Sequence, residues 1–458
     1  MTVALPAIDT DLHAGLAGLQ WTVNAYTLTL SALLLLGGVL GDRVGRRQIF
    51  LVGVAGFALA SLACAAAPAL PALVAARAVQ GVGAALLTPA SLAVLHASFA
   101  PADRSRAVGL WSGMSGLASA VGPFLGGWLV DVAGWRWVFL INLPLAALVG
   151  LLIARYVPAS ATAGPAPTTA GPARTSRRQA RRQVLARLDL PGAGLVGVCL
   201  GALSYALIRA SDTGWGPATV TASAVAVAAG LGFALVERAR PDALVPPWVL
   251  RDRAFRRINE VTLLVYAAFT GLTFLLVVVL QVGHQLSATR AGAVLLPTTG
   301  VMLLLSGWAG GLAGRIGPRA PIAVGSLVCA GASWWLSGIT AATPYGVLLS
   351  ASGLLGVGMA LIVAPLTAAV LASLPDRHAG LAGALNTTVA RVAGLLAVAG
   401  LPLVAGLSGS ALADPTQLRA GFSVAARVCA LLLVSGGLLC AAIPRERPPR
   451  VDPAVPRG

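Results

Sequence analysis

The sequence predicts an all-α membrane protein whose helices cross the bilayer many times. Hydrophobic residues make up 57% of the 458 residues and charged residues 10%, against about 25% charged residues in soluble domains. Apolar runs of about 20 residues recur along the chain with no soluble block between them. Most of the basic residues, all of them arginine, lie in every second connection between these runs. The composition excludes a soluble globular protein and a disordered or collagen-like chain.

Thirteen runs are long enough to cross a bilayer core about 30 Å thick at about 1.5 Å per helical residue. The runs cover 22–41, 49–67, 71–97, 107–130, 136–154, 190–208, 217–236, 260–282, 291–313, 321–340, 345–372, 380–406 and 421–443. They lack the alternating polarity of β-barrel strands. Because they are rich in Gly, Ala and Ser, the predicted helices can approach one another closely.

The arginines predict the topology. If the connection 41–48 is cytoplasmic, the cytoplasmic connections and tail hold 25 arginines and the outer connections hold four. An excess of this kind is typical of cytoplasmic loops. We therefore expect a multi-pass protein of the cell membrane with a cytoplasmic C-terminus. The pI of about 11.4 then comes from the arginines that orient the helices in the membrane, and we expect no nucleic-acid partner.

The start of the chain is apolar but short. Residues 1–8 would cover about 12 Å as a helix, less than half a bilayer, and they lack the charged segment of a signal peptide. With the run at 22–41 starting outside, we expect residues 1–8 to be the outer end of a first helix. The hypothesis is a fourteen-helix protein whose chain, as given, begins inside helix 1.

An internal repeat relates the two ends of the chain. The segment from Gly37 to Arg47 returns from Gly310 to Arg319, and Gly81-Val82-Gly83 returns as Gly356-Val357-Gly358. Two halves in the same orientation predict a pseudo-twofold axis along the membrane normal. We expect an N-terminal helix bundle (1–155), a basic cytoplasmic linker (156–188), an inserted helix pair (189–237), a cytoplasmic connector (238–258), a C-terminal six-helix bundle (259–444) and a cytoplasmic tail (445–458).

Three motifs stand out. The first is a loop with closely spaced glycines and charges, composed of Gly38, Gly41, Asp42, Arg43, Gly45, Arg46 and Arg47. It can act as a gate whose charges pair with moving helix ends, or merely anchor the inner side of the protein; an anchoring role explains the arginines but not the glycine spacing.

The second motif is Arg77 with Gln80. Arg77 is a charge inside a predicted span that either faces the bundle or extends its side chain to the membrane surface.

The third motif is rich in glycine and contains a proline, in the run 107–130. It comprises Gly116, Gly122, Pro123, Gly126 and Gly127. Small residues let helices touch, and Pro123 interrupts the helical hydrogen bonds and bends the helix. The second half has no Gly-Pro at the corresponding position, so the motif is not a structural element common to both halves.

Together these motifs resemble those of the major facilitator superfamily, and more closely its fourteen-helix drug/proton antiporter branch. The resemblance covers nearly the whole chain, and the segments 20–26, 135–144 and 386–391 support it. It implies the major facilitator fold and secondary active efflux of small amphipathic or hydrophobic compounds by proton antiport with alternating access. The partners would be a small-molecule substrate, protons and the lipid bilayer, with the proton gradient as energy source and no cofactor. We expect a monomer.

The resemblance also implies roles for single residues. Arg77 matches the buried-arginine motif, and the Gly116–Gly127 segment matches the antiporter signature. Arg391, in the middle of a run, is a second candidate for the buried charge that couples transport, or it pairs structurally with a helix carbonyl or a carboxylate. Asn24, Tyr26, Gln80 and Asn386 are candidates for lining the cavity, although a tyrosine near a span end is often an interfacial residue.

One departure concerns proton coupling. Related proteins typically carry an Asp in helix 1 a few residues before the Val-Ala-Leu-Pro seen here at 3–6, and the chain begins after that position. The alternatives are an exporter of one endogenous metabolite or lipid, and an uncoupled or inactive truncated copy. A membrane enzyme is disfavoured, because the four histidines are far apart and the five cysteines form no close pairs, so we expect neither catalytic residues nor a metal site.

Overall fold

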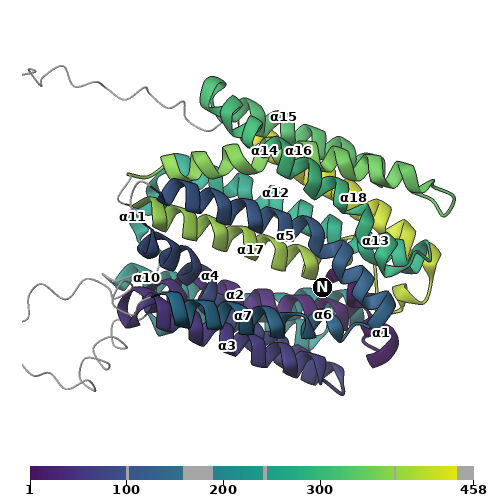
Figure 1. Ribbon diagram of the computed structural model, residues 1–458. Coiled ribbons are helices and arrows are strands. Elements are labelled where there is room, and N and C mark those ends of the chain that lie inside the picture. Colours follow the sequence, from purple (N-terminus) through teal and green to yellow (C-terminus); the bar gives the residue numbers. More distant parts are fainter. Residues whose placement is uncertain (100–102, 158–188, 241–244, 376–377, 441–458) are drawn as a thin grey trace, which may run out of the picture.

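The computed structural model describes residues 1–99, 103–157, 189–240, 245–375 and 378–440. The described residues form an elongated bundle of helices, shown in Figure 1. Twelve of its segments are long and apolar enough to cross a membrane by length and composition. The predicted all-α, multi-pass class is therefore confirmed.

The helices follow one another along the chain in three groups. After a 3₁₀ turn at Thr2–Ala4, the first group is α1 (Leu5–Leu12), α2 (Gly15–Val44), α3 (Arg46–Ala65), α4 (Leu70–Ser98), α5 (Arg104–Ala133), α6 (Trp137–Leu140) and α7 (Asn142–Tyr156). The middle group is α9 (Leu190–Thr213), α10 (Pro217–Ala239) and α11 (Pro247–Arg251). The last group is α12 (Arg253–Val278), α13 (Ala288–Val294), α14 (Leu296–Ile316), α15 (Arg319–Leu336), α16 (Tyr345–Ala372), α17 (Ala379–Val404) and α18 (Pro415–Cys440).

Twelve of the thirteen predicted runs correspond to the candidate spans. The run 321–340 is a helix, α15, but this helix is not among the twelve candidate spans. It begins at Arg319 and ends at Leu336, so it is shorter at its C-terminal end than the run predicted. With 18 residues, the first of them Arg319, α15 is shorter than each of the twelve candidate spans, and it packs against α16 and α18.

Some predicted segments lie outside the described residues or differ at their ends. The linker 156–188 lies outside them except for its first two residues, and so does the tail 445–458. The connector 238–258 contains α11 and the first residues of α12. The apolar start of the chain forms the Thr2–Ala4 turn and α1; the turn packs against α5, α12 and α13.

The sequence repeat is also a repeat of helix packing. In the first half α4 packs against α2 and α3, and in the second half α16 packs against α14 and α15. A Cβ atom at Gly81 would overlap the Tyr26 carbonyl of α2, and one at Gly356 would overlap the Thr298 carbonyl of α14. Glycine at these two equivalent positions lets equivalent helix pairs touch backbone to backbone.

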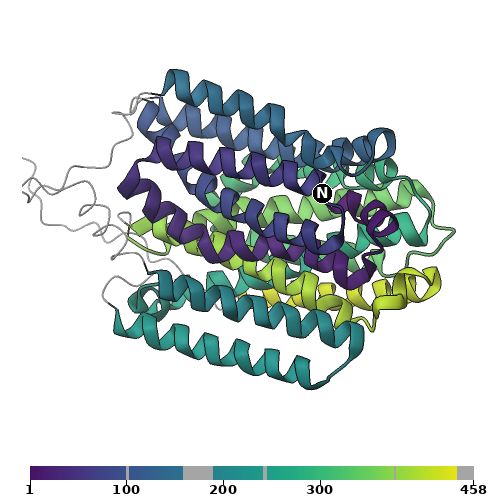
Figure 2. The ribbon, with the colours of Figure 1, turned by 90° about the horizontal axis from the view of Figure 1, so that it is seen from below.

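The two halves meet along two contacts, which we call the seam. On one side α2 packs against α17, and on the other side α5 packs against α13 and α14. The α9–α10 pair lies outside this arrangement, with α9 against both α2 and α17 and α10 mainly against α9; Figure 2 shows the pair at the edge of the bundle.

The bundle has two ends of different charge. At the arginine-rich end lie the loop at Gly45, the ends of α7 and α10 and the start of α12; at the arginine-poor end lie the turns after α1, α3, α5 and α9. At the latter, Asp11 forms an ion pair of 2.7 Å with Arg136 and accepts a hydrogen bond of 3.0 Å from Trp135 Nε1. The hydrogen bonds from Trp135 and Arg136 lower the pKa of the Asp11 carboxyl.

The helix contact at Gly81 predicts a stability difference between two substitutions. Gly81→Ala would force α4 away from α2, and overpacking of this kind costs about 1–3 kcal/mol. Gly56→Ala on α3 is the control, because an added Cβ there meets no atom within 4 Å. We expect thermal unfolding in detergent to give a lower Tm for Gly81→Ala and an unchanged or higher Tm for Gly56→Ala. Equal Tm values would contradict the packing explanation.

Candidate functional site

Arg77 is buried inside the first half. Its side chain is 7% exposed, its Nε donates a hydrogen bond of 3.0 Å to the Thr22 carbonyl of α2, and its Nη1 donates to Gln80 Oε1. The guanidinium carbon lies 4.4 Å from the centroid of the Tyr26 ring. Of the two sequence alternatives, the structure therefore shows Arg77 facing the bundle, with no carboxylate pairing with it among the described residues.

Gln80 extends this contact to two further helices. Its Nε2 donates a hydrogen bond of 2.7 Å to Ser61 Oγ of α3, and Asn142 Nδ2 of α7 lies 3.5 Å from the same oxygen. One network thus joins α2, α3, α4 and α7. Hydrogen bonds and the stacked ring stabilise a cation that would be costly to bury alone.

Gln20 and Asn24 lie one turn apart on α2 and differ in their surroundings. Gln20 Nε2 reaches across the seam and donates to the carbonyls of Val398 (2.7 Å) and Ala399 (3.1 Å) on α17. Asn24 is 1% exposed, and neither atom of its amide group has a hydrogen-bond partner among the described residues. Such a group is costly to bury, so Asn24 is a buried polar side chain whose hydrogen-bonding capacity the described residues leave unsatisfied.

The other side of the seam is held by Asp131 near the end of α5. Its carboxylate accepts hydrogen bonds from the backbone N–H groups of Ala288 (3.1 Å) and Thr289 (2.8 Å), and from the Thr289 hydroxyl. The first turn of a helix has N–H groups without an internal partner. Asp131 therefore caps α13 from the opposite half.

The glycines of the third motif lie along the same contact. A Cβ at Gly127 would overlap the Ala288 carbonyl, and Gly116 lies beside Leu303 of α14. Gly126 faces Val3, Pro123 lies against Gly292 of α13, and Gly122 has open space around it. Four of the five motif residues therefore make contacts outside α5, and three of these contacts cross the seam.

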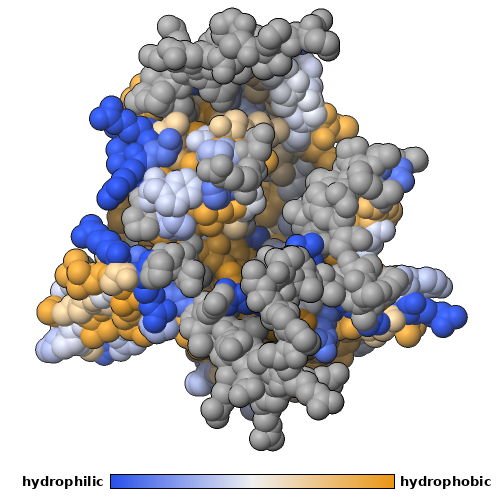
Figure 3. Space-filling model, turned by 90° about the vertical axis from the view of Figure 1, so that its left-hand side faces the viewer, coloured by the Kyte–Doolittle hydropathy of each residue, from blue (hydrophilic) through white to orange (hydrophobic). Residues whose placement is uncertain are grey.

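The seam is closed at one end of the bundle and hollowed at the other. The hydrogen bonds of Gln20 and Asp131 both lie toward the arginine-poor end. Seen from the arginine-rich end, hydrophilic residues lie around the rim and hydrophobic residues are visible in the recess between the halves (Figure 3). The described arrangement thus offers access from the arginine-rich end.

The loop motif lies at the arginine-rich end, between α2 and α3. Arg47 Nη2 donates a hydrogen bond of 2.6 Å to the Ala154 carbonyl, in the last turn of α7. A cation at a helix C-terminus is favourable because free carbonyls and the helix dipole are negative there. Gly38, Gly41, Arg43, Gly45 and Arg46 lie in the same segment, and the side chain of Asp42 is outside the described part.

Arg391 and Asn386 lie on α17 in the second half. Asn386 Nδ2 donates hydrogen bonds to Asn259 Oδ1 (3.1 Å) and Thr262 Oγ1 (2.7 Å) of α12, so this cavity candidate is engaged within the half. Arg391 is exposed and, among the residues that the structure describes, makes no hydrogen bond or ion pair. It interacts electrostatically with Tyr266 of α12. The structure therefore brings Arg77, Gln80 and Tyr26 together and leaves Arg391 apart from them.

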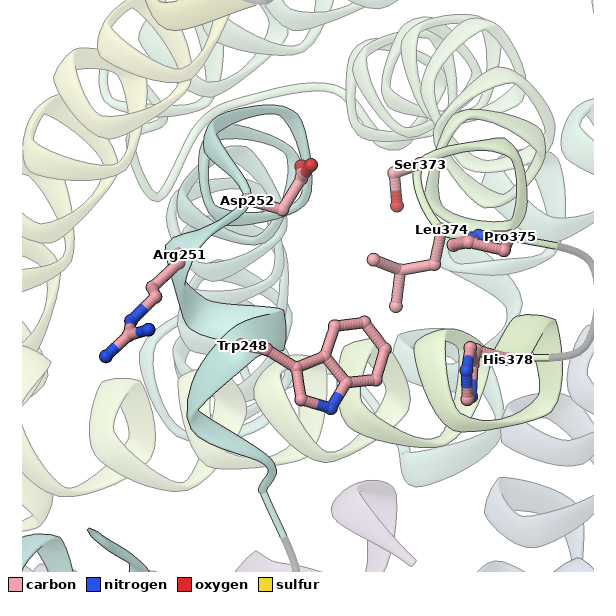
Figure 4. A pocket seen from close by; sticks show the side chains of 7 residues that line it. All are labelled: Trp248, Arg251, Asp252, Ser373, Leu374, Pro375 and His378. Carbon is pink, nitrogen blue, oxygen red and sulfur yellow. The ribbon is translucent and has the colours of Figure 1, made fainter.

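A separate pocket of about 650 Å³ lies at the arginine-rich end of the second half. Trp248 of α11 and His378 form one side, with ring centroids 4.9 Å apart, and Figure 4 shows Arg251 pointing away from it. The pocket involves none of the residues predicted from the sequence. No three His, Cys, Asp or Glu side chains of the described ranges are close enough to hold a metal ion.

Sequence reasoning missed the two residues that hold the seam. Asp131 follows the predicted run 107–130 and looks like an ordinary residue at the end of a span, and Gln20 opens the segment 20–26, which supported the resemblance without giving Gln20 a contact. Their partners are 157 and 378 residues away. The local signal is Ser287, which marks the start of α13, the helix to which Asp131 bonds: its side chain accepts a hydrogen bond from the backbone N–H of Arg290.

Comparison with known proteins places these features among transporters. Residues 1–241 and 237–398 match the Major Facilitator Superfamily. The tetracenomycin C resistance and export protein of Streptomyces glaucescens is 36% identical over 403 residues, 87% of this chain and 71% of that protein. The cephamycin export protein CmcT of Amycolatopsis lactamdurans is 34% identical over 98% of this chain and 90% of its own length.

A third relative and the solved structures agree with this placement. The puromycin resistance protein of Streptomyces alboniger is 36% identical over 90% of this chain and 80% of its own. A bacterial homologue of the human drug peptide transporters PepT1 and PepT2 has a similar fold, with a TM-score of 0.66, 16% identity, and coverage of 96% of this chain and 93% of the other. This likeness shows the fold alone.

The closed end of the seam can be tested with a cysteine probe. In detergent, Ala399→Cys should react slowly with a maleimide, because Ala399 is buried beside Gln20. Adding Gln20→Ala removes the hydrogen bonds across the seam, worth about 1 kcal/mol each, so we expect labelling roughly tenfold faster. Gln285→Ala is the control, since Gln285 bonds only to Val282 of its own segment. An unchanged rate with Gln20→Ala would show that these hydrogen bonds do not close the seam.

Proposed function

The chain belongs to the Major Facilitator Superfamily, and we propose that it exports small amphipathic or hydrophobic compounds, drugs and antibiotics among them, by proton antiport. The family and the relatives it matches are transporters, so the protein is a membrane transporter and not an enzyme. The relatives named for tetracenomycin C, puromycin and cephamycin support export of drug-like compounds. The proton gradient would be the energy source, and the protein would act as a monomer.

The single observation that carries the proposal is the asymmetry of the seam. Two halves built from equivalent helices touch through Gln20 and Asp131 at one end and leave a recess at the other. In transporters built from repeats, alternating access arises when one half rocks against the other around a central site. Breaking the contacts at the closed end and closing the recess would turn the same site to the opposite side.

The charge of the loops supports the direction of transport. With 25 arginines to four, the arginine-rich end would be the cytoplasmic one, in a multi-pass protein of the cell membrane with a cytoplasmic C-terminus. The recess then opens toward the cytoplasm. This is the state in which an exporter takes up its substrate.

The motif residues have distinct places in this mechanism. The Arg77 network joins four helices of one half, so we assign Arg77 to coupling, with Gln80 and Tyr26 holding it in place. The loop from Gly38 to Arg47 holds the end of α7 through Arg47 and would act as the inner gate. The segment Gly116–Gly127 is the sliding surface of the seam. The α9–α10 pair, packed outside both halves, would be the inserted helix pair.

Export is tested with cells that express the protein and a fluorescent probe. We expect less accumulation of the probe than in cells with the empty vector, and we expect the difference to disappear when an ionophore collapses the proton gradient. Export that persists without the gradient would contradict proton antiport but not export. Equal accumulation of several probes in both cell types would contradict export itself.

Arg77→Lys tests the role of the buried guanidinium. A lysine keeps the charge but cannot stack on Tyr26 while bonding both Thr22 and Gln80, because its ammonium group is not planar. We expect export, compared at equal amounts of folded protein, to fall by about tenfold or more, since an interaction worth about 1.4 kcal/mol corresponds to a factor of ten, and we expect a lower Tm because a buried partner loses its donor. Arg427→Lys on α18 is the matched control, because Arg427 lies over Trp334 away from this network. Wild-type export by Arg77→Lys would exclude the proposed role.

A further inference from the structure

We propose that Arg391 binds the negatively charged group of the transported compound, so that the cargo class is amphipathic organic anions such as carboxylic acids. The inference rests on the proposed function and adds a substrate class to it. Four observations support it: the depth of Arg391, the face of α17 on which it lies, the unsatisfied Asn24 amide on the opposite helix, and the distribution of charge in the spans.

Arg391 lies too deep to reach water at either membrane surface. It is near the middle of α17, a candidate span from Ala379 to Val404, so each helix end is about 18 Å away at 1.5 Å per residue. Its side chain is nevertheless exposed and has no hydrogen bond or ion pair within the described ranges. Charged residues at this depth are costly and normally face the bundle interior or an aqueous cavity.

The face of α17 that carries Arg391 is the face that meets the other half. Positions 387, 391, 395 and 399 lie one above another, because residues four apart share a helix face. The Ala399 carbonyl accepts a hydrogen bond from Gln20 of α2, and Leu395 is fully buried. One turn further, Arg391 and then Thr387 are exposed. On this face Arg391 is therefore the first exposed side chain below the contact with Gln20.

Asn24 provides a second polar group from the opposite half. Because α2 and α17 run in opposite directions at the Gln20 contact, the residue one turn after Gln20 lies at the level one turn before Ala399. That residue is Asn24, which is buried with no partner for its amide group. A carboxylate at the recess can accept two parallel hydrogen bonds from the guanidinium, the geometry for which arginine is suited; Asn24, which is 1% exposed, lies one turn above Arg391, level with the buried Leu395.

The fixed charges of the spans favour an anion. Arg77 and Arg391 lie inside the first and second halves respectively. The carboxylates with described side chains in the spans (Asp131, Asp212, Glu237 and Glu260) all lie within about two turns of a helix end. Glu260 is paired with Arg257 at 2.9 Å. A positive interior attracts anions into the recess and disfavours cations of equal size.

Two dyes of nearly the same shape and opposite charge separate the alternatives. Fluorescein carries a carboxylate and rhodamine 6G a delocalised cation, on the same ring system. We expect purified protein to bind fluorescein, measured by fluorescence anisotropy, and reconstituted vesicles with an imposed proton gradient to transport it. Arg391→Gln should weaken fluorescein binding and transport at least about tenfold, the loss of a charge-assisted contact, with rhodamine 6G unchanged or improved. Arg391→Lys should fall between the two.

Arg427→Gln is the matched control, since it removes another mid-helix arginine that stacks on Trp334. It should leave both dyes unaffected. Equal losses for both dyes with Arg391→Gln, or no loss for either, would overturn the inference, as would transport of rhodamine 6G with no binding of fluorescein by the wild type. Arg391-dependent binding of fluorescein without gradient-driven transport would instead contradict the proposed function and leave the anion site standing.

Discussion

Backbone contact between helices at glycine is the constraint on which the rest of this structure depends. Lipid is as apolar as a leucine side chain, so burial alone gives helices little reason to associate in a membrane, and close packing has to do so. Gly81 and Gly356 bring equivalent helices together in the two halves. Gly127, at Ala288, and Gly292, at Pro123, bring the two halves together. Because these glycines set how close the helices lie, they also set where Arg77 of α4 meets α2 and where the two halves meet.

Much of the architecture could be predicted from the sequence, because its signals are local or repeat at a fixed offset. Run length, arginine distribution and the returning Gly-Val-Gly predict spans and repeat without a partner being known. The shortness of α15 was missed because a long apolar run hid the helix end at Leu336. The hydrogen bonds of Gln20 and Asp131, and the lack of a hydrogen-bond partner for the buried Asn24 amide, depend on which helices lie side by side, and no local pattern encodes that.

Two arginines inside the bundle differ in a way that only the structure reveals. Arg77 has its hydrogen bonds and ring contact supplied by its own half, so its charge is held in a fixed place. Arg391 is exposed and lacks such partners among the described residues, and in the proposed anion site it faces the recess. A charge whose partners belong to the protein suits a permanent structural role, whereas a charge without such partners suits a group that binds and releases substrate in each transport cycle.

The position of α9 has a mechanical consequence. Because α9 packs against α2 of one half and α17 of the other, it bridges one edge of the seam, while at the other edge the short Thr2–Ala4 turn packs against both α5 and α13. In the proposed cycle, rocking of the halves would shear α9 against at least one of them. The pair α9–α10 would then resist the motion on one flank, and substitutions on the surface of α9 would change the speed of the cycle without touching the cargo.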